Sequence, residues 1–398
     1  MKNTNISSPV IFLTEHFHPS NGATAQLITD LVADTRRAGI PLKVLTSTPK
    51  DPEDESADYI YRTSKESTSQ ATILSKTLRG LRFLVSALVW LSLYAQPGQT
   101  IFIVSNPPFV GIIGLVLRYT KRIRYIFLLQ DVFPRSATLT GLLPSRGPGV
   151  WFWRKLLSLV LHNSSLVVTL SSAMVQRCKD DFGSLIPIKE IHNWSILDLT
   201  EKTSRQNQLA REWGLDNIFT IQYSGNFGRL HDLLTILEAA RLLEHEPIMF
   251  VFIGDGAKRE QIEIYKHRYT LNNIVIKPFQ DRAFLAQSLM ASDLSFVSMI
   301  PGADDTIAPS KLYGILSLSK PVVLIGNQNS ELANILREYN CGIVIPNGDP
   351  ALLASKLSQI SQNPQLLREM SENSFKLYNA KYGRERSTNA YISLFRGI

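Results

Sequence analysis

The segment 308–316, which reads APSKLYGIL, combines residue types that can bind an anion. Ser310 is a typical N-cap residue, and the backbone amides of Lys311 and Leu312 would then be free at the start of a helix. Free amides and the helix dipole stabilise an anion there, and Lys311 adds a full positive charge. An ordinary capped helix gives the same pattern, but the flexible loop 301–303 before it favours phosphate binding.

A second cluster directly follows an apolar stretch, 219–223, that is typical of a strand. Gly225 and Gly228 would let the backbone approach a ligand closely, with Asn226 beside them, and the forked guanidinium of Arg229 could reach a diphosphate. The spacing is not GxGxxG, so a dinucleotide site is not indicated. Turn residues after a strand give the same pattern.

Two further loops follow strand-like segments of the same half. Gly254 lies in the loop 254–256, after the segment 249–253, and Phe279 lies in the loop 277–280, after the segment 274–276. Ligands bind at the carboxyl ends of strands in such sheets. If the ligand is a nucleotide, we expect Gly254 to approach it and Phe279 to lie near its base.

Asp131 is the only acid between residues 67 and 178, a region with twelve Lys and Arg. A positive field keeps a carboxylate ionised, so we expect Asp131 to orient an acceptor hydroxyl or to take its proton. Capping of a turn is the alternative. His16, just after the strand 10–13, could hydrogen-bond a sugar hydroxyl or could simply lie in a polar surface loop.

These residues need elements that place them at one edge of a sheet. At 398 residues the chain predicts two domains, and apolar runs alternate with helical patterns in both halves. We therefore expect an α/β protein of two Rossmann-like, doubly wound domains, 1–195 and 218–383, that face each other across a cleft. The segment 196–217 is expected to be a linker, and 384–398 is expected to be a helix that packs back on the first domain. The expected strands are 10–13, 42–46, 101–104, 125–129, 166–169, 219–223, 249–253, 274–276, 294–297, 322–325 and 342–345.

The net charge of +8 lies entirely in the first half, where residues 1–195 hold 21 basic and 13 acidic residues. This excess is suited to an anionic membrane surface or a phosphorylated acceptor; nucleic acid is disfavoured, because no nucleic-acid module is recognised. The stretches 76–95 and 150–155 combine basic, aromatic and apolar residues, which fits either a buried helix or a helix on the membrane surface. Two cysteines and no secretory signal indicate a cytoplasmic protein. The two stretches allow this protein to be peripheral on the inner face of the cell membrane.

The order of the motifs YSGNFGR, FIGDG and APSKLYGILSLSKPVV, with DVFP in the first half, resembles family 4 of the retaining glycosyltransferases. The likeness is strongest to members that build exopolysaccharide and lipopolysaccharide. It implies the GT-B fold, with 1–195 as the acceptor-binding domain and 218–383 as the nucleotide-sugar-binding domain. It also implies that Arg229, Ser310 and Lys311 hold the donor diphosphate, that Gly22 approaches the transferred sugar and that Asp131 serves the acceptor. The family's chemistry needs no bound metal.

The chain departs from this family at three places. Two glutamates that typically contact the transferred sugar and the ribose align with Thr306 and Gly314, and a basic residue beyond Arg229 is replaced within His231-Asp232-Leu233. Asp304 or Asp305 could replace the first glutamate through a shifted loop, a hypothesis based only on nearness in sequence.

The sequence therefore predicts a retaining transfer from a nucleotide-sugar, with a UDP-sugar expected and no cofactor, to a glycan or a polyprenyl-diphosphate-linked sugar in cell-surface polysaccharide biosynthesis. Two alternatives remain at this point. One is a sugar-nucleotide 2-epimerase of the same fold, and the other is a degenerate nucleotide-sugar-binding protein without turnover.

Overall fold

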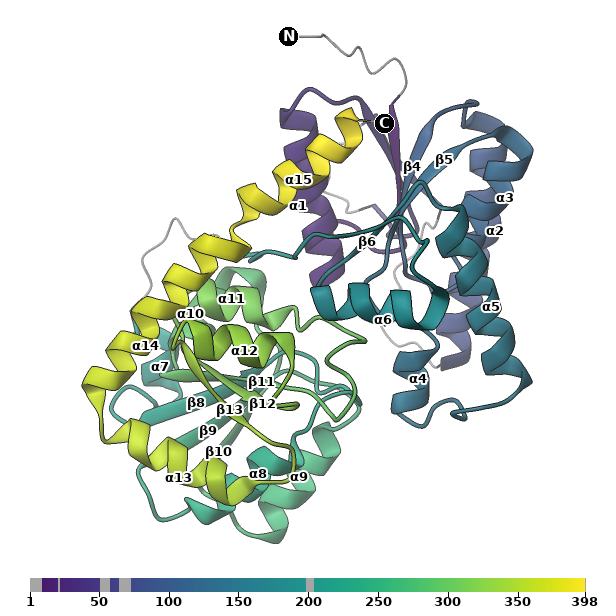
Figure 1. Cartoon of the computed structure of the whole chain (residues 1–398). Coiled ribbons are helices and arrows are strands. Elements are labelled where there is room, and N and C mark those ends of the chain that lie inside the picture. The colour runs from purple at the N-terminus through teal and green to yellow at the C-terminus, as the bar shows by residue number, and fades with distance from the viewer. Residues whose placement is uncertain (1–8, 21, 51–57, 64–72, 198–203, 398) are drawn as a thin grey trace. The chain divides into compact units, whose positions relative to one another are not determined.

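The computed structural model describes residues 9–20, 22–50, 58–63, 73–197 and 204–397 (Figure 1). The chain forms two compact units. The first comprises Met1–Asn193, Thr306–Ala308 and Arg384–Ile398, and the second comprises Trp194–Asp305 and Pro309–Gly383. Each unit is a parallel sheet covered by helices on both faces, as the alternating pattern predicts.

The sheet of the first unit has the strand order β3-β2-β1-β4-β5-β6-β7, and all of its paired strands are parallel. Its centre is buried on both faces, because consecutive residues of β1 and β4, whose side chains point to opposite faces, are all buried. The strands are β1 (Val10–Leu13), β2 (Leu42–Thr46), β3 (Ile60–Arg62), β4 (Thr100–Val104), β5 (Arg124–Leu128), β6 (Leu166–Thr169) and β7 (Ile188–Glu190).

Helices α2, α3 and α5 lie side by side on one face of this sheet, and α1 and α15 cover the other face (Figure 1). Helix α3 comes close to the sheet because Gly114 leaves no side chain between it and Tyr125. The helices of this unit are α1 (Ala23–Arg37), α2 (Ile73–Tyr94), α3 (Gly111–Lys121), α4 (Arg135–Leu139), α5 (Pro148–Asn163), α6 (Ser172–Phe182) and α15 (Arg384–Arg396).

Helix α15 completes the core of the first unit, although it lies at the other end of the sequence. The ring of Phe395 lies 5.4 Å from the ring of Phe12 and 5.5 Å from that of Phe102, and Tyr391 also contacts Phe102. Arg384 at the start of the helix forms ion pairs with Asp30 and Asp34 of α1. The expected final helix is therefore part of the first unit's hydrophobic core.

The second unit has a six-stranded parallel sheet of order β10-β9-β8-β11-β12-β13. Its strands are β8 (Phe219–Ser224), β9 (Ile248–Ile253), β10 (Ile274–Lys277), β11 (Leu294–Ser298), β12 (Val322–Ile325) and β13 (Gly342–Ile345). Helices α8 (Leu234–Leu242), α9 (Arg259–Arg268) and α13 (Pro350–Ser361) cover one face (Figure 1). The other face carries α10 (Arg282–Met290), α11 (Lys311–Ser317), α12 (Glu331–Glu338) and α14 (Pro364–Leu377), which the π-helix Tyr378–Tyr382 continues.

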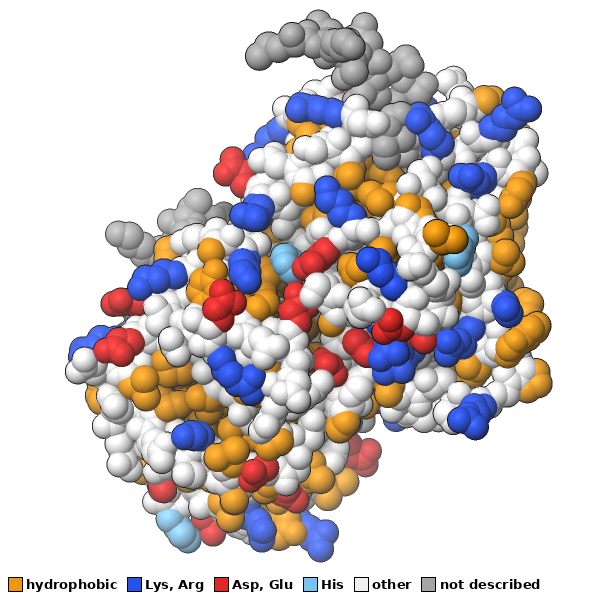
Figure 2. Space-filling view, in the orientation of Figure 1, with side chains coloured by type: hydrophobic (Ala, Val, Ile, Leu, Met, Phe, Trp, Pro, Cys, Tyr) orange, Lys and Arg blue, Asp and Glu red, His pale blue; other side chains and the backbone are white. Residues whose placement is uncertain are grey.

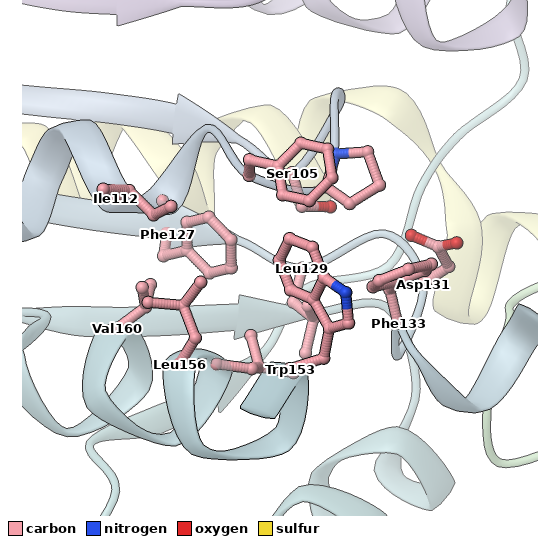
Figure 3. A pocket seen from close by; sticks show the side chains of 13 residues that line it. Ser105, Ile112, Phe127, Leu129, Asp131, Phe133, Trp153, Leu156 and Val160 are labelled. Carbon is pink, nitrogen blue, oxygen red and sulfur yellow. The ribbon is translucent and has the colours of Figure 1, made fainter. Parts of the chain in front are cut away.

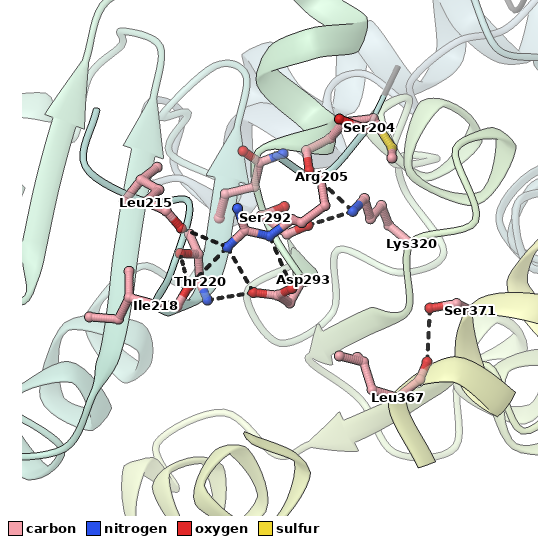
Figure 4. A network of polar contacts seen from close by, with 12 residues as sticks. Ser204, Arg205, Leu215, Ile218, Thr220, Ser292, Asp293, Lys320, Leu367 and Ser371 are labelled. Atoms are coloured by element: carbon pink, nitrogen blue, oxygen red, sulfur yellow. Dashed lines mark hydrogen bonds and ion pairs between the residues drawn. The ribbon is translucent and has the colours of Figure 1, made fainter. Parts of the chain in front are cut away.

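The segment expected as a linker, 196–217, belongs to the second unit. Its helix α7 (Gln208–Glu212) contacts α10, and Arg205 binds Asp293 through two nitrogens, Nε and Nη2, each 3.0 Å from a carboxylate oxygen. The same carboxylate accepts the amide of Thr220, so this segment is fastened to the start of β8 (Figure 4). Residues 198–203 of the segment lie outside the described residues.

All eleven expected strands are present, and several are longer by one residue at one end. Two short strands at the edges of the first sheet, β3 and β7, are not in the prediction, because three residues carry no readable alternation. Within the described residues, no helix has the length and apolar character needed to cross a bilayer.

Candidate active site

The carboxyl ends of β8, β9 and β10 carry three of the expected donor-binding loops. The amide of Gly225 donates to the carbonyl of Ile253 (2.8 Å), and that of Gly254 donates to the carbonyl of Lys277 (3.0 Å). The loops after the three strands are thus hydrogen-bonded to one another at one edge of the sheet. This is the edge at which open α/β sheets bind their ligands.

Gly225 and Gly254 are both required by backbone geometry, with φ of +127° and +138°. A Cβ on Gly254 would lie 2.1 Å from the carbonyl oxygen of Gly225, so packing alone demands a glycine there. A Cβ on Gly225 would lie 3.7 Å from Cε of Lys311. The structure therefore gives Gly254 a packing role and places Gly225 beside the expected phosphate-binding lysine.

Lys311 directs its ammonium group into the protein beside the end of β8. Its Nζ lies 3.3 Å from the centroid of the Tyr223 ring, and this Nζ is covered and has no hydrogen-bond partner among the described residues. Burial lowers the pKa of Lys311 well below its usual value. Because a buried ammonium without an acceptor is costly, the site is built to gain from an anion.

His231 is a neutral neighbour of this lysine. Its Nδ1 donates to the carbonyl of Ser298 (2.7 Å), and burial, followed by the charge of Lys311, lowers its pKa to about 3. A neutral imidazole with Nδ1 protonated leaves Nε2 as an acceptor. The imidazole therefore adds no positive charge at this place.

Arg229, Asn226 and Phe279 all expose their side chains. The carbonyl of Asn226 accepts the hydroxyl of Tyr223 (3.1 Å), which fixes the turn that leads to Arg229. The ring of Phe279 would lie 3.4 Å from a Cβ on Gly254, so it stands next to the glycine loops. An exposed guanidinium and an exposed ring at this edge are both available to a ligand.

The expected cap at Ser310 is wrong. Ser310 has helical backbone angles and makes no side-chain cap, and the amide of Leu312 donates to the carbonyl of Pro309 (3.0 Å). A capping residue needs an extended backbone to turn its oxygen toward the helix, and Ser310 lacks it. Since α11 has seven residues and the Leu312 amide is already paired, the charge of Lys311 remains as the anion-binding feature.

The two positions that lack the family's glutamates differ in their surroundings. Thr306 is fully buried, and its Oγ1 accepts from Nε of Arg135 (2.9 Å) within the first unit. A Cβ on Gly314 would meet Leu197 and Leu289 at 3.6 and 3.7 Å, so this face of α11 packs against apolar side chains. Neither position presents a free polar group.

Asp304 and Asp305 are both partly buried. The Oδ2 of Asp304 accepts from Nδ2 of Asn327 (3.0 Å), after β12. The carboxylate of Asp304 is thus held at the carboxyl end of a strand of the second unit.

Asp131 follows β5 and is fixed by several contacts of the first unit. Its Oδ2 accepts from Oγ of Ser136 (3.2 Å), its backbone pairs with Ile307, and the next amide, of Val132, donates to the carbonyl of Thr306 (3.0 Å). Burial raises the pKa of Asp131. Burial outweighs the hydrogen bonds that lower this pKa, so the carboxylate is ionised less readily than the expected positive field would make it.

Asp131 lies at one end of an apolar pocket in the first unit (Figure 3). Phe133 and Trp153 line the pocket next to Asp131, and Ile112 and Val160 lie at its far end. The remaining lining residues are Ser105, Pro108, Phe109, Gly111, Phe127, Leu129, Leu156 and Leu157. Asp131 is the one charged residue of this lining, and its carboxylate points away from the apolar rings (Figure 3).

His16 and Gly22 lie after β1, which is separated from β5 by β4 in the sheet. His16 is half-buried, with Nε2 3.8 Å from a carboxylate oxygen of the buried Glu15. Gly22 precedes α1 with an ordinary negative φ of −65°, and its carbonyl accepts the amide of Gln26. Both residues lie at the carboxyl edge of the first sheet, as Asp131 does.

Two residues at the donor edge escaped the sequence prediction, Lys258 and Tyr223. Lys258 stands two residues after Gly256 and donates to the carbonyl of His231. Lys258 was visible in the sequence as the last residue of GDGAK, but the sequence alone does not distinguish a ligand-binding lysine there from a solvated one.

No cluster of three or more His, Cys, Asp or Glu side chains suited to a metal ion occurs in the part of the chain that the structure describes.

Comparison with solved structures identifies the fold. Sucrose-phosphate synthase from Thermosynechococcus elongatus superposes with a TM-score of 0.77 at 16% identity, covering 98% of both chains. Alr3699/HepE from Anabaena superposes with a TM-score of 0.73 at 14% identity, covering 98% of this chain and all of that one. The two Rossmann-like units thus form the expected GT-B architecture.

Comparison of sequences identifies the class. The chain is 26% identical over 293 residues to the probable glycosyltransferase WbjE of Pseudomonas aeruginosa, covering 71% of this chain and 72% of WbjE. It is 28% identical over 200 residues, 49% of each chain, to WcaI of Escherichia coli K12, a putative colanic acid biosynthesis glycosyl transferase. Residues 206–377 match the family of glycosyl transferases group 1. The chain thus contains a region similar to this family, and its sequence relatives and fold are those of a nucleotide-sugar-dependent glycosyltransferase with the GT-B fold.

Proposed function

We propose that this protein transfers a sugar, with retention of configuration, from a UDP-sugar to a lipid-linked sugar in cell-surface polysaccharide biosynthesis. The observation that carries the donor assignment is the buried, unpartnered Nζ of Lys311 beside Gly225, next to the turn that ends at Arg229. In the reaction the bond from sugar C1 to the diphosphate breaks, and the diphosphate leaves with the electron pair. Lys311 and Arg229 stabilise the charge that develops on it.

UDP is the proposed nucleotide because solved relatives of this fold hold it. HepE of Anabaena is described in complexes with UDP, with UDP and glucose, and with UDP-glucose. The polysaccharide assignment is supported by WcaI, whose description names colanic acid biosynthesis, and by the resemblance of the motifs. No bound metal or cofactor has a role in the proposed transfer.

The acceptor assignment is supported by the pocket of the first unit. Its lining is almost entirely apolar, and Asp131 stands at one end with its carboxylate held by Ser136 (Figure 3). The acceptor oxygen forms the new bond to C1 and loses its proton to a base, a role that fits Asp131 because burial raises its pKa. His16 contributes a hydrogen bond to a sugar hydroxyl in this proposal.

Contact with an anionic membrane surface is supported by the outer side of α2 and α5. Val85, Val89 and Leu93 of α2 are more than half exposed, while Phe83 and Leu91 of the same helix are buried. Trp151 and Phe152 of α5 are exposed beside Arg154 and Lys155. Hydrophobic and basic side chains occur together along this side (Figure 2), as in helices that lie at a bilayer surface.

The donor assignment is tested by measuring release of UDP from UDP-sugars with and without a membrane extract that supplies acceptors. We expect release only with extract, and a loss of about 100-fold in Arg229→Ala and in Lys311→Ala, since a hydrogen bond to a charged group contributes about 1.5–3 kcal/mol. Lys356→Ala, an exposed lysine of α13, is the matched control. Full release by both site variants would reject the assigned phosphate site.

A binding protein without turnover is the second candidate, because Thr306 is engaged by Arg135 and Gly314 faces apolar side chains where the family has carboxylates. Tight binding of a nucleotide-sugar without release in any extract would favour it. Interconversion of the sugar without acceptor would instead indicate an epimerase.

A further inference from the structure

The structure offers a replacement for the basic residue that is missing beyond Arg229. His231 stands in that stretch and is neutral, but the Nζ of Lys258, from the loop after β9, donates to its backbone carbonyl. We propose that Lys258 is a further donor-binding residue, which supplies to the diphosphate the positive charge that the sequence lacks after Arg229. This inference rests on the proposed function of the same edge of the sheet.

The main chain of Lys258 is fixed to the turn that bears Arg229. Its amide donates to the carbonyl of Phe227 (3.0 Å), and the amide of Phe227 donates to the carbonyl of Asp255 (2.8 Å). Gly256 makes this approach possible, because a Cβ there would lie 2.4 Å from Oδ1 of Asn226. Lys258 thus starts from the same rigid pair of loops as the proposed phosphate contacts.

Three basic side chains and one carboxylate act on one another at this place. Burial lowers the pKa of Lys258, Asp232 raises it, and Arg229 lowers it. Lys311, when it carries a proton, adds a positive charge near His231 and lowers the pKa of that histidine. A nucleoside diphosphate would relieve the repulsion among these cations.

Asp232, the carboxylate that raises the pKa of Lys258, is already engaged by neutral donors. It accepts from the amide and hydroxyl of Thr235 (3.2 and 2.8 Å) and from Nδ2 of Asn347 (2.8 Å). These bonds hold Asp232 at the start of α8, away from a direct ion pair with Lys258 in the described residues. The cations therefore keep most of their capacity for an added anion.

If Lys258 had only a structural role, it would hydrogen-bond the His231 carbonyl and would not contact the ligand. A structural role and a phosphate-binding role can be distinguished, because a phosphate contact affects binding only when the ligand carries phosphate. We therefore compare three ligands that differ in their number of phosphate groups: uridine, UMP and UDP. Each is titrated into the protein, and binding is measured by calorimetry. If GDP, ADP or dTDP binds more tightly than UDP, the nucleoside, monophosphate and diphosphate of that base are used in place of the uridine compounds.

In Lys258→Met we expect UDP to bind about 10- to 100-fold more weakly, the range for loss of one charge-assisted contact, and uridine to bind as before. Lys258→Arg should retain most of the UDP affinity, and Lys356→Met should behave as the wild type. An equal loss for uridine and UDP, or no loss for either, would overturn the proposal. If UDP binding weakens in Lys311→Met but not in Lys258→Met, the proposed function stands and this inference fails. If the wild type binds no nucleoside diphosphate, both fail.

Discussion

The ammonium of Lys311 lies 3.3 Å from the centre of the Tyr223 ring and makes no hydrogen bond within the described residues. The negative face of an aromatic ring compensates a cation only in part, by about 2 kcal/mol when the pair is shielded from water. Tyr223 is itself fixed, since its hydroxyl donates to the carbonyl of Asn226. The ring thus holds the lysine in place while leaving its Nζ available to a ligand.

Binding of UDP should take up a proton at Lys311. Burial holds the pKa of this lysine well below its usual value in the free protein, and a bound diphosphate stabilises the protonated form and raises that pKa. Affinity should therefore fall as pH rises from 6 to 9. His231, with a pKa of about 3, stays neutral over this range and does not contribute.

Proton uptake is measured by titrating UDP in two buffers of different ionisation enthalpy at one pH. The apparent binding enthalpies should differ for the wild type and agree for Lys311→Met. Identical enthalpies for the wild type in both buffers would show that the lysine does not change its protonation.

Asp131→Asn should separate acceptor chemistry from donor binding. The amide keeps the size of the carboxyl group but cannot take a proton, so turnover should fall by about 100- to 10,000-fold, the range for loss of general acid–base catalysis. UDP affinity should be unchanged. The assay is UDP release with membrane extract, with calorimetric UDP titration as the binding control, and near-normal turnover would exclude Asp131 as the base.

The same substitution should raise stability at neutral pH. The pKa of Asp131 is raised in the folded protein, so its contribution to stability is present below the unfolded pKa and is lost as pH rises through the folded pKa. The denaturation midpoint of Asp131→Asn should exceed that of the wild type at pH 7, and the difference should shrink as pH falls toward 4. An equal gain at both pH values would point to a cause other than ionisation.

Val85→Glu combined with Val89→Glu should release the protein from anionic vesicles. Both side chains lie on the exposed side of α2, and two carboxylates there would oppose both apolar insertion and attraction to anionic lipid. We expect bound protein to fall by about tenfold or more in flotation with phosphatidylglycerol vesicles, as each valine loses up to about 1.5 kcal/mol of burial. Leu185→Glu with Leu242→Glu, two exposed leucines elsewhere, adds the same charge as a control. Equal release by both double variants would indicate a net-charge effect without a defined surface.

Two glycine substitutions should have opposite effects on stability. Gly314 lies inside α11, where a Cβ would make ordinary contacts at 3.6 Å or more, so Gly314→Ala should stabilise the protein by about 0.5–1 kcal/mol. Gly254→Ala places a Cβ 2.1 Å from a carbonyl oxygen at a φ of +138° and should destabilise by about 3 kcal/mol or more. Denaturant unfolding measures both, and a loss of stability in Gly314→Ala would show that α11 tolerates no side chain there.

The sequence was sufficient for eleven of the thirteen described strands, because parallel strands buried on both faces appear as short, continuous apolar runs. The segments 219–223 and 249–253 are examples, and the rule that ligands bind after such strands placed Gly225 and Gly254 at one edge without coordinates. The same rule placed His16 and Asp131 at the carboxyl edge of the first sheet.

The features that could not be predicted from the sequence depend on backbone angles, on burial and on contacts between distant residues. Ser310 is a favoured capping residue by type, but only its angles show that it makes no cap. Asp131 stands among basic residues in the sequence, yet burial controls its pKa. The polar segment around Arg205 resembled a linker because its partner, Asp293, lies 88 residues away.

The place of α15 has a consequence for how the chain is made. The aromatic faces of Phe12 and Phe102 are covered by Phe395, so the hydrophobic core of the first unit is assembled from both ends of the described sequence. During synthesis the ribosome delivers the whole second unit before it delivers α15. The rings of Phe12 and Phe102 therefore stay uncovered by Phe395 until translation has passed residue 395.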